Sequence, residues 1–170
     1  MTKTGGFVRP MESRDLEMVL RWRNDESVRR YMYTQHEITL EEHSGWFKRA
    51  SAAADRRLLV FERGGEPLGF INFHDNGAVG IADWGFYIAP EAPRGTGSAL
   101  GKAALNYAFG SINLHKICGQ ALGFNNGSIR FHDKLGFTRE GVLRQQHFDG
   151  KTYHDIICFG LMHSEWHKPV

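Results

Sequence analysis

Apolar side chains recur at helical spacing in the first third of the chain and at strand spacing in much of the remainder. The first helix is expected to begin at Ser13, a good N-cap residue, and to be interrupted at Asn24-Asp25. A short second helix over residues 28–32 follows, and the capping box Thr39-Leu40-Glu41-Glu42 predicts a third. The N-terminal part of the chain is therefore predicted to be helical.

Apolar runs separated by glycine-containing turns predict strands in the rest of the chain. The expected strands cover residues 6–11, 57–63, 67–74, 79–88 and 116–122, with two more after Phe137 that meet at Asp149-Gly150. Helices are expected between the fourth and fifth strands and again just before Phe137. This order predicts a single α+β domain over residues 1–170, built on one mixed, mostly antiparallel sheet of about seven strands.

The segment from Tyr87 to Lys102 reads as a strand, a proline-broken loop, a glycine-spaced turn and a helix. Amides at a helix N-terminus lack intrahelical partners, and the helix dipole favours negative charge there. Gly95 and Gly97 allow a ligand to approach the backbone closely, and Arg94 adds positive charge. These features predict a site for a phosphate or pyrophosphate group.

Three kinds of phosphate-binding loop could account for this segment, and two of them fail on detail. A P-loop would place its first glycine at Thr96, and a dinucleotide fingerprint would need a third glycine at Leu100, so neither fits. The spacing of Arg94, Gly97 and Ala99 resembles the pyrophosphate loop of the GNAT family of N-acetyltransferases, which bind acetyl-coenzyme A. A tight strand-to-helix turn with a solvated arginine is the structural alternative.

A second resemblance to the same family lies downstream, in a short helix that Asn125 or Asn126 caps and Gly136 ends. The residues that match the second motif of the family are Asn125, Ser128, Ile129, Lys134, Gly136 and Phe137. Two motifs in the family's order are more specific than either alone.

The resemblance implies the GNAT fold, in which two central strands splay apart and hold pantetheine between them. Acetyl-coenzyme A would then be the cosubstrate, and no metal is needed. The cofactor contacts implied are Phe86, Tyr87, Ile88, Arg94, Gly95, Thr96, Gly97, Ser98, Ala99, Asn125, Ser128 and Lys134. Backbone amides of residues 86–88 would stabilise the oxyanion.

One departure concerns the general acid. Many family members carry a tyrosine where this chain has His132, and histidine can also protonate a thiolate. His132 is therefore the first candidate for the general acid, and Ser128 is the second. The alternative for His132 is an exposed histidine on a helix face. The general base is left open between His74, Asp83 and an ordered water chain.

The N-terminal helices carry the pattern Trp22-Arg23-Asn24, Met32-Tyr33-Thr34 and Ile38 to His43. This arrangement resembles the acetyltransferases of pseudaminic acid biosynthesis and implies a UDP-linked 4-amino-4,6-dideoxy sugar as acceptor. The expected acceptor contacts are Arg23, Asn24, Tyr33, His43, His74 and Tyr87. Core packing of the aromatic residues and a solvated arginine face are the alternatives.

Other acceptors and a different class of function remain open. Relatives with a similar C-terminal half acetylate ribosomal-protein or peptide N-termini, and aminoglycosides are a further class of amine. An aminoglycoside enzyme should show an acidic cluster, and none is visible in the sequence. A non-catalytic coenzyme A sensor is the alternative outside enzymes.

Composition and charge narrow the possible classes of function. The 21 Lys and Arg residues nearly balance the 19 Asp and Glu residues, which argues against nucleic-acid binding as the main activity. No apolar run has membrane-spanning length, and residues 1–6 do not resemble a signal peptide, so a cytoplasmic location is expected. Cys118 and Cys158 are expected to be free thiols.

The histidines do not form a recognised metal motif, and only His163 and His167 have a helical spacing that weakly suggests a metal pair. No metal is therefore expected. An exposed hairpin near the C-terminus could support a homodimer.

Overall fold

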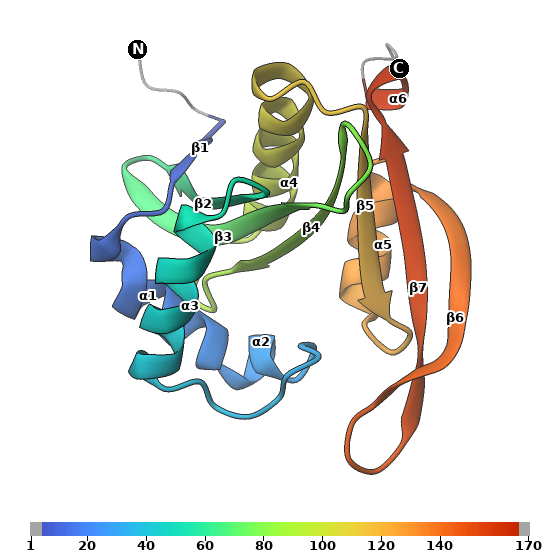
Figure 1. Ribbon diagram of the computed structural model, residues 1–170, viewed down its shortest axis with the longest axis horizontal. Coiled ribbons are helices and arrows are strands. Elements are labelled where there is room, and N and C mark those ends of the chain that lie inside the picture. The colour runs from blue at the N-terminus through green and yellow to red at the C-terminus, as the bar shows by residue number, and fades with distance from the viewer. Residues whose placement is uncertain (1–4, 167–170) are drawn as a thin grey trace.

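In the computed structural model, which describes residues 5–166, seven strands form one sheet in the order β1-β2-β3-β4-β5-β7-β6 (Figure 1). Neighbouring strands are antiparallel, except that β4 and β5 are parallel. The strands are β1 (Phe7–Pro10), β2 (Arg56–Arg63), β3 (Glu66–Asp75), β4 (Ile81–Ile88), β5 (Lys116–Leu122), β6 (Thr138–Phe148) and β7 (Tyr153–Met162). The predicted α+β fold around one mixed sheet is confirmed.

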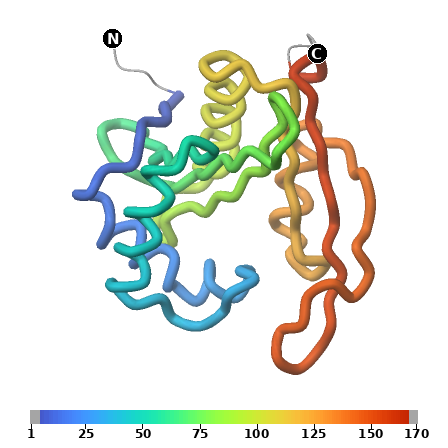
Figure 2. The backbone as a smooth tube through the Cα atoms, viewed as in Figure 1, coloured from blue at the N-terminus to red at the C-terminus, as the bar shows by residue number. Residues whose placement is uncertain are grey.

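Helices cover both faces of this sheet, with α1 and α3 on one face and α4 and α5 on the other (Figures 1 and 2). They are α1 (Leu16–Asn24), α2 (Glu26–Arg29), α3 (Leu40–Ala52), α4 (Thr96–Asn106), α5 (Asn126–Lys134) and α6 (His163–Trp166), with a short 3-10 turn at Ser13–Asp15 and a π-helical turn at Tyr107–Ser111. No helix among residues 5–166 is long and apolar enough to cross a membrane.

Local capping explains where the N-terminal helices begin. The capping box predicted before α3 is present, because the Thr39 side chain accepts from the Glu42 amide and the Glu42 carboxylate accepts from the Thr39 amide. The second helix was predicted over residues 28–32 but runs from Glu26 to Arg29. It begins earlier because the Asp25 side chain accepts from the Ser27 amide and so acts as its N-cap.

Strand β2 shows how the sheet divides the core into two layers. Leu58 and Val60 pack with residues of α1 and α3, whereas Leu59 and Phe61 pack with residues of α4. Successive side chains of a strand point to opposite faces, so one apolar run supplies both layers. Complete burial of such a side chain contributes about 1.5–3 kcal/mol.

The sheet opens between its two central strands. β4 and β5 are paired only from Ile81 opposite Lys116 to Asp83 opposite Cys118, and they separate beyond that point. The separated part of β4 keeps β3 as its neighbour, so one edge of residues 84–88 faces the opening. This confirms the predicted splay of the central strands and places a gap in the middle of the domain.

Strand β6 forms the outer edge of the C-terminal half and is almost entirely exposed. At the tip of its hairpin with β7, the exposed rings of Phe148 and Tyr153 lie 4.7 Å apart between centroids. An exposed sheet edge can pair with another chain. The homodimer predicted from this hairpin stays a prediction.

Candidate active site

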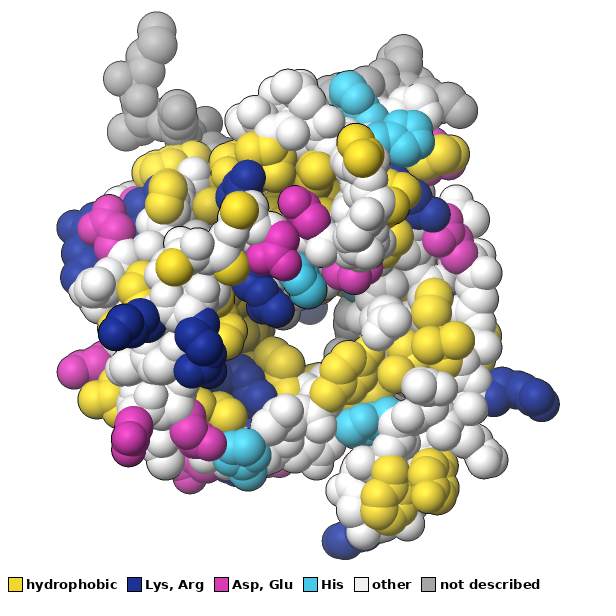
Figure 3. Space-filling view, viewed as in Figure 1, with side chains coloured by type: hydrophobic (Ala, Val, Ile, Leu, Met, Phe, Trp, Pro, Cys, Tyr) yellow, Lys and Arg dark blue, Asp and Glu magenta, His cyan; other side chains and the backbone are white. Residues whose placement is uncertain are grey.

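A cavity of about 1190 Å³ lies where β4 and β5 separate. Its walls come from the loop between α2 and α3, the start of α3, strands β3, β4 and β5, and the N-terminal end of α5. Figure 3 shows the molecule hollowed between its N-terminal half and the strands β5–β7. Sites for one small ligand usually measure about 300–1,000 Å³, so this cavity has room for two substrates.

The loop before α4 is shaped by Gly95 and braced by Thr96. Gly95 is the N-cap of α4 and has φ of 87°, a left-handed conformation that glycine adopts without strain. The buried Thr96 donates to the Pro93 carbonyl from both its amide (3.1 Å) and its hydroxyl (2.7 Å). Its hydroxyl also accepts from Arg63 Nη2 at 3.2 Å. The side chain of Thr96 therefore holds the loop in place, and a cofactor contact from it is disfavoured.

Two amides in the first turn of α4 remain for a ligand. The Thr96 amide is bonded to Pro93, and the Ala99 amide is bonded to the Gly95 carbonyl at 3.2 Å, which leaves those of Gly97 and Ser98. Gly97 lines the cavity, and Ser98 is exposed. This end of the cavity therefore fits an anionic group such as a pyrophosphate.

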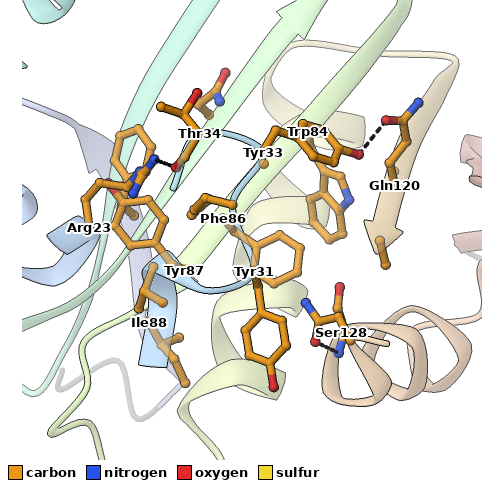
Figure 4. Close-up of a pocket in the computed structure, with 18 of the residues that line it drawn as sticks. Arg23, Tyr31, Tyr33, Thr34, Trp84, Phe86, Tyr87, Ile88, Gln120 and Ser128 are labelled. Carbon is orange, nitrogen blue, oxygen red and sulfur yellow. Dashed lines mark hydrogen bonds between the residues drawn. The ribbon is translucent and has the colours of Figure 1, made fainter. Parts of the chain in front are cut away.

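The predicted cofactor residues of β4 and of the N-terminal end of α5 border the same cavity. Phe86, Tyr87 and Ile88 line it along the free edge of β4. On the opposite side, the Asn125 side chain accepts from the Ser128 amide at 3.1 Å and caps α5. Figure 4 shows Ser128 across the cavity from Phe86 and Ile88 of β4. The cavity thus brings together residues from both motifs.

Six predicted cofactor residues, namely Arg94, Gly95, Thr96, Ser98, Ala99 and Lys134, lie outside the cavity lining. Arg94 is exposed on the loop before α4, close to the free amides. Lys134 is exposed in the last turn of α5, whereas Asn125 and Ser128 at its first turn border the cavity. A cofactor contact from Lys134 is therefore disfavoured by its position, and one from Arg94 stays a prediction.

The structure places His132 in the core, which corrects its sequence-based interpretation. Only 1% of the residue is exposed, and its ring stacks on Phe159 with centroids 4.5 Å apart. Its Nδ1–H donates to the Ser128 carbonyl at 2.8 Å, and its Nε2 accepts from Trp84 Nε1 at 3.1 Å. Burial lowers the pKa of His132, although the bond to the Ser128 carbonyl opposes this shift.

This geometry argues against both interpretations of His132 as a general acid and as an exposed histidine. A neutral ring whose two nitrogens are already engaged has no proton to deliver into the cavity. Ser128, one turn earlier on α5, lines the cavity and is the remaining candidate for the proton donor.

On the α1–α3 side, Arg23 presents an unused hydrogen-bond donor. Its Nη2 donates to the Thr34 carbonyl at 2.7 Å, while its Nη1 is buried without a partner among the described residues (Figure 4). Burial lowers the pKa of Arg23, and nearby Arg29 adds to this effect. A half-buried guanidinium with a buried, free N–H is suited to an anionic or oxygen-rich ligand.

His43 and Tyr87 lie beside Arg23 in the same part of the cavity lining. Only 4% of His43 is exposed, and its Nε2 has no partner in the part of the chain that the structure describes. Burial lowers the pKa of His43 and raises that of Tyr87. Both side chains are therefore neutral at pH 7 and add hydrogen-bonding capacity without charge.

Asn24 does not contact the cavity, contrary to its prediction as an acceptor residue. Its Nδ2 donates to the Ile38 carbonyl and its Oδ1 accepts from the Ile38 amide, both at 2.8 Å. Because both ends of its carboxamide are bonded to the Ile38 backbone, Asn24 positions the loop between α2 and α3.

Tyr33 connects this loop to the other half of the molecule. Its hydroxyl donates to Gln120 Oε1 on β5 at 2.8 Å, so it spans the cavity (Figure 4). Its ring lies 5.4 Å from that of His147 on β6, and burial raises its pKa to about 12. Tyr33 lines the cavity, and its role as an acceptor contact stays a prediction.

The candidate bases His74 and Asp83 are cross-strand neighbours on β3 and β4, and both line the cavity. His74 Nε2 lies 3.1 Å from Asp55 Oδ2. Burial raises the pKa of Asp83, which makes its carboxylate a better proton acceptor than an ordinary aspartate. Asp83 is also the last residue of β4 that is paired with β5.

Sequence analysis missed several residues that build the site, namely Asn72, Trp84 and Gln120. Trp84 fixes His132, and Gln120 accepts from Tyr33. Asn72 lines the cavity and interrupts an otherwise apolar strand, which was the available signal. The contacts of Trp84 and Gln120 join positions 48 and 87 residues apart, so no local pattern could have shown them.

No group of three metal-ligating side chains occurs among residues 5–166. His163, of the weak pair noted in the sequence, lies at the start of α6 and stacks on Phe109, whereas His167 lies outside the described residues.

The chain is similar to several known acetyltransferases. Residues 7–138 match the family model described as an acetyltransferase (GNAT) domain. The N-acetyltransferase YokL of Bacillus subtilis is 33% identical over 128 residues, which cover 71% of this chain and 70% of that protein. The spermidine N(1)-acetyltransferase of Escherichia coli K12 is 30% identical over 153 residues, which cover 88% of this chain and 82% of that protein.

The resemblance to pseudaminic acid acetyltransferases is more distant. Acetyltransferase PseH of Campylobacter jejuni is 22% identical over 128 residues, which cover 75% of this chain and 80% of that protein. Among solved structures, the Vibrio cholerae spermidine N-acetyltransferase in complex with CoA and spermine matches with a TM-score of 0.89. It is 22% identical, and the match covers 98% of this chain and 100% of that one.

These matches agree with a splayed sheet, a free helix N-terminus and a cavity large enough for two substrates. The chain belongs to the GNAT family of acetyltransferases and is an N-acetyltransferase that uses acetyl-coenzyme A.

Proposed function

We propose that this enzyme acetylates the 4-amino group of a UDP-linked 4-amino-4,6-dideoxy sugar, as in pseudaminic acid biosynthesis. The observation that carries this proposal is the buried, unpartnered Nη1 of Arg23 in the acceptor part of the cavity. A diphosphate or sugar oxygen would satisfy this donor, and the unpartnered Nε2 of His43 could accept from a sugar hydroxyl.

The charge of the cavity supports an acceptor that is not a polycation. Among the lining residues, Arg23 and Arg56 balance Glu42 and Asp83. A polyamine would meet a buried guanidinium with no surplus of carboxylates to offset the repulsion. An acceptor that combines one amine with anionic or hydroxyl oxygens matches this balance better.

In the proposed reaction, both substrates bind before acetyl transfer occurs. The amine nitrogen forms a C–N bond with the thioester carbonyl carbon, while the C–S bond breaks and its electron pair leaves on sulfur. An amide on the free edge of β4 would donate to the carbonyl oxygen as negative charge develops there. The amine loses one proton to Asp83, His74 or water, and Ser128 protonates the thiolate.

A second candidate is polyamine acetylation, and the relatives named above favour it. The E. coli protein is named a spermidine N(1)-acetyltransferase, and the V. cholerae structure holds spermine. Ribosomal or peptide N-termini are a third class of acceptor, since a putative ribosomal N-acetyltransferase of B. subtilis is 28% identical over 104 residues. A coenzyme A sensor would bind the cofactor without turnover. A cytoplasmic location and a homodimer remain proposals.

The test is release of free thiol from acetyl-coenzyme A with a panel of amines. The panel contains a UDP-4-amino-4,6-dideoxy sugar, spermidine, a ribosomal N-terminal peptide and an aminoglycoside. We expect the highest kcat/KM with the UDP-amino sugar. Selective turnover of spermidine would establish the second candidate, and tight cofactor binding without turnover of any amine would favour the sensor.

A further inference from the structure

Asn72 on β3 has a carboxamide that the fold itself does not use. Its Oδ1 is buried and has no hydrogen-bond partner among residues 5–166, and the residue lines the cavity. Buried polar atoms in native proteins almost always have partners, because an unpaired one is costly to remove from water. An unpaired oxygen on a residue that lines a substrate cavity therefore indicates a group that a ligand satisfies.

The position of Asn72 coincides with the start of the splay. Asn72 is the cross-strand partner of Gly85 on β4, which lies two residues beyond Asp83, the last β4 residue paired with β5. A Cβ atom at Gly85 would lie 3.3 Å from Asn72 Nδ2, closer than most such contacts. The glycine thus leaves room for the carboxamide to lie against the backbone of β4 at this point.

The acceptor amine must reach the thioester from this face of the sheet. On the opposite face at the same level, Ala82 and Trp84 pack in the core with residues of α4 and α5, and Trp84 also borders the cavity. Side chains alternate along β4, so Asp83 and Gly85 face the Asn72 side, and both line the cavity. His74 and Asp83 form the next cross-strand pair on that side.

We propose that Asn72 Oδ1 accepts an N–H from the acceptor amine and so directs the nitrogen lone pair toward the thioester carbon. The inference rests on the proposed acetyl transfer to an amine, but not on which class of amine is used. The nitrogen gains positive charge as the C–N bond forms, so its N–H donates more strongly in the transition state than in the bound substrate. Asn72 is then a catalytic residue with a larger effect on kcat than on KM.

The main test compares Asn72→Leu with Asn72→Asp, each in the 170-residue chain. Leucine has nearly the same shape but no polar atoms, so it removes the unpaired oxygen without leaving a cavity. We expect Asn72→Leu to lower kcat with the best amine of the panel by roughly tenfold to a hundredfold. The KM for acetyl-coenzyme A should stay unchanged, and the Tm should stay equal or rise.

Asn72→Asp separates the oxygen from the amide N–H groups. It keeps an acceptor oxygen at the same position and should retain more of the kcat than the leucine variant does. If the carboxamide instead used its N–H groups, the aspartate variant would be as inactive as the leucine variant.

Asn24→Leu is the matched control, because it changes the same residue type at a position where both amide ends are already bonded to Ile38. This variant should lower the Tm. A lower Tm for Asn72→Leu with an unchanged kcat would overturn the proposal, since it would show that Asn72 stabilises the fold, for example through a bound water.

The experiments distinguish a failure of the role proposed for Asn72 from a failure of the proposed function. If spermidine proves to be the preferred amine, the proposed sugar acceptor is wrong, but the effect of Asn72→Leu is still expected with spermidine. If no amine is acetylated, the proposed function fails, and the Tm of Asn72→Leu alone decides whether the carboxamide has a structural role.

Discussion

His132 and His43 are both buried, but they lie on opposite sides of the sheet and have different surroundings. On the α5 side, His132 has a partner for each ring nitrogen, namely Trp84 Nε1 and the Ser128 carbonyl. On the α1–α3 side, the Nε2 of His43 has no partner among the described residues. The difference indicates that His132 stabilises the fold and that His43 Nε2 is available to bind a ligand.

The same contrast holds for other polar groups of the two regions. Thr96 on the α4 side is buried with its hydroxyl bonded to Pro93 and Arg63. On the acceptor side, Arg23 Nη1 and Asn72 Oδ1 are buried without partners in the described part of the chain. Because each unpaired buried group destabilises the fold by about 1–3 kcal/mol, several in one cavity point to substrate binding.

The largest expected effect separates Ser128 from His132. Ser128→Ala should lower kcat by about a hundredfold, because removal of a general acid typically costs at least that much, while acetyl-coenzyme A binding is kept. His132→Phe should change kcat by no more than about threefold, because its ring packs among Phe159 and other aromatic residues without facing the cavity. Steady-state kinetics of both variants would check this pair. A large loss in His132→Phe with an unchanged Tm would restore the histidine as the general acid.

The next effect concerns the acceptor end. Arg23→Met should lower kcat/KM for the acceptor by roughly tenfold to a hundredfold, as expected for loss of hydrogen bonds to a charged group. The KM for acetyl-coenzyme A should not change. Arg21→Met is the matched control on the same helix. Arg21 is exposed, and its Nη2 lies 3.5 Å from Glu91 Oε1 in a surface ion pair. Equal losses in both variants would argue against a specific role for Arg23.

A smaller effect is expected at the cofactor loop. A Cβ atom at Gly97 would come no closer than 4.0 Å to Phe131, so Gly97→Ala should fold normally. Because Gly97 lines the cavity, its new methyl group should weaken coenzyme A binding by about tenfold, which calorimetry can measure. Gly95→Ala should instead lower the Tm, since alanine is strained at φ of 87°. Unchanged affinity in Gly97→Ala would contradict the position assigned to the pyrophosphate.

The smallest expected effect is on the pH dependence of stability. Burial lowers the pKa of both His132 and His43 in the folded state, so the unfolded chain binds more protons below the ordinary pKa of about 6.5. Stability should therefore be complete above pH 6.5 and decrease as the pH falls through the lowered folded values. Thermal unfolding between pH 7.5 and 5.5 would show this decrease, and His132→Phe should reduce it. A flat profile in the wild type would show that these histidines are less buried than the structure indicates.

The sequence predicted the features that depend on neighbouring residues. The order of helices and strands along the chain, the capping box at Thr39 and the cap at Asn125 follow from local chemistry, and all are present. The two motifs also led to the cavity, because the strand-to-helix connections of this fold bring residues 86–90, Gly97, Asn125 and Ser128 to its walls.

The sequence could not predict contacts that form only when distant strands meet. The role of His132 depends on Trp84, which lies 48 positions away on another strand. The role of Asn24 depends on the path of a loop that returns to it at Ile38. A polar residue in a motif therefore indicates a place in the fold more reliably than it indicates a chemical role.

The most direct test of the acceptor assignment is the ratio of kcat/KM for the UDP-4-amino-4,6-dideoxy sugar to that for spermidine, measured in the wild type and in Arg23→Met. We expect the wild type to prefer the sugar and the variant to lower the ratio about tenfold or more, with spermidine turnover unchanged or higher. A wild-type preference for spermidine, or an equal loss with both amines, would contradict the proposal that Arg23 selects an oxygen-rich acceptor.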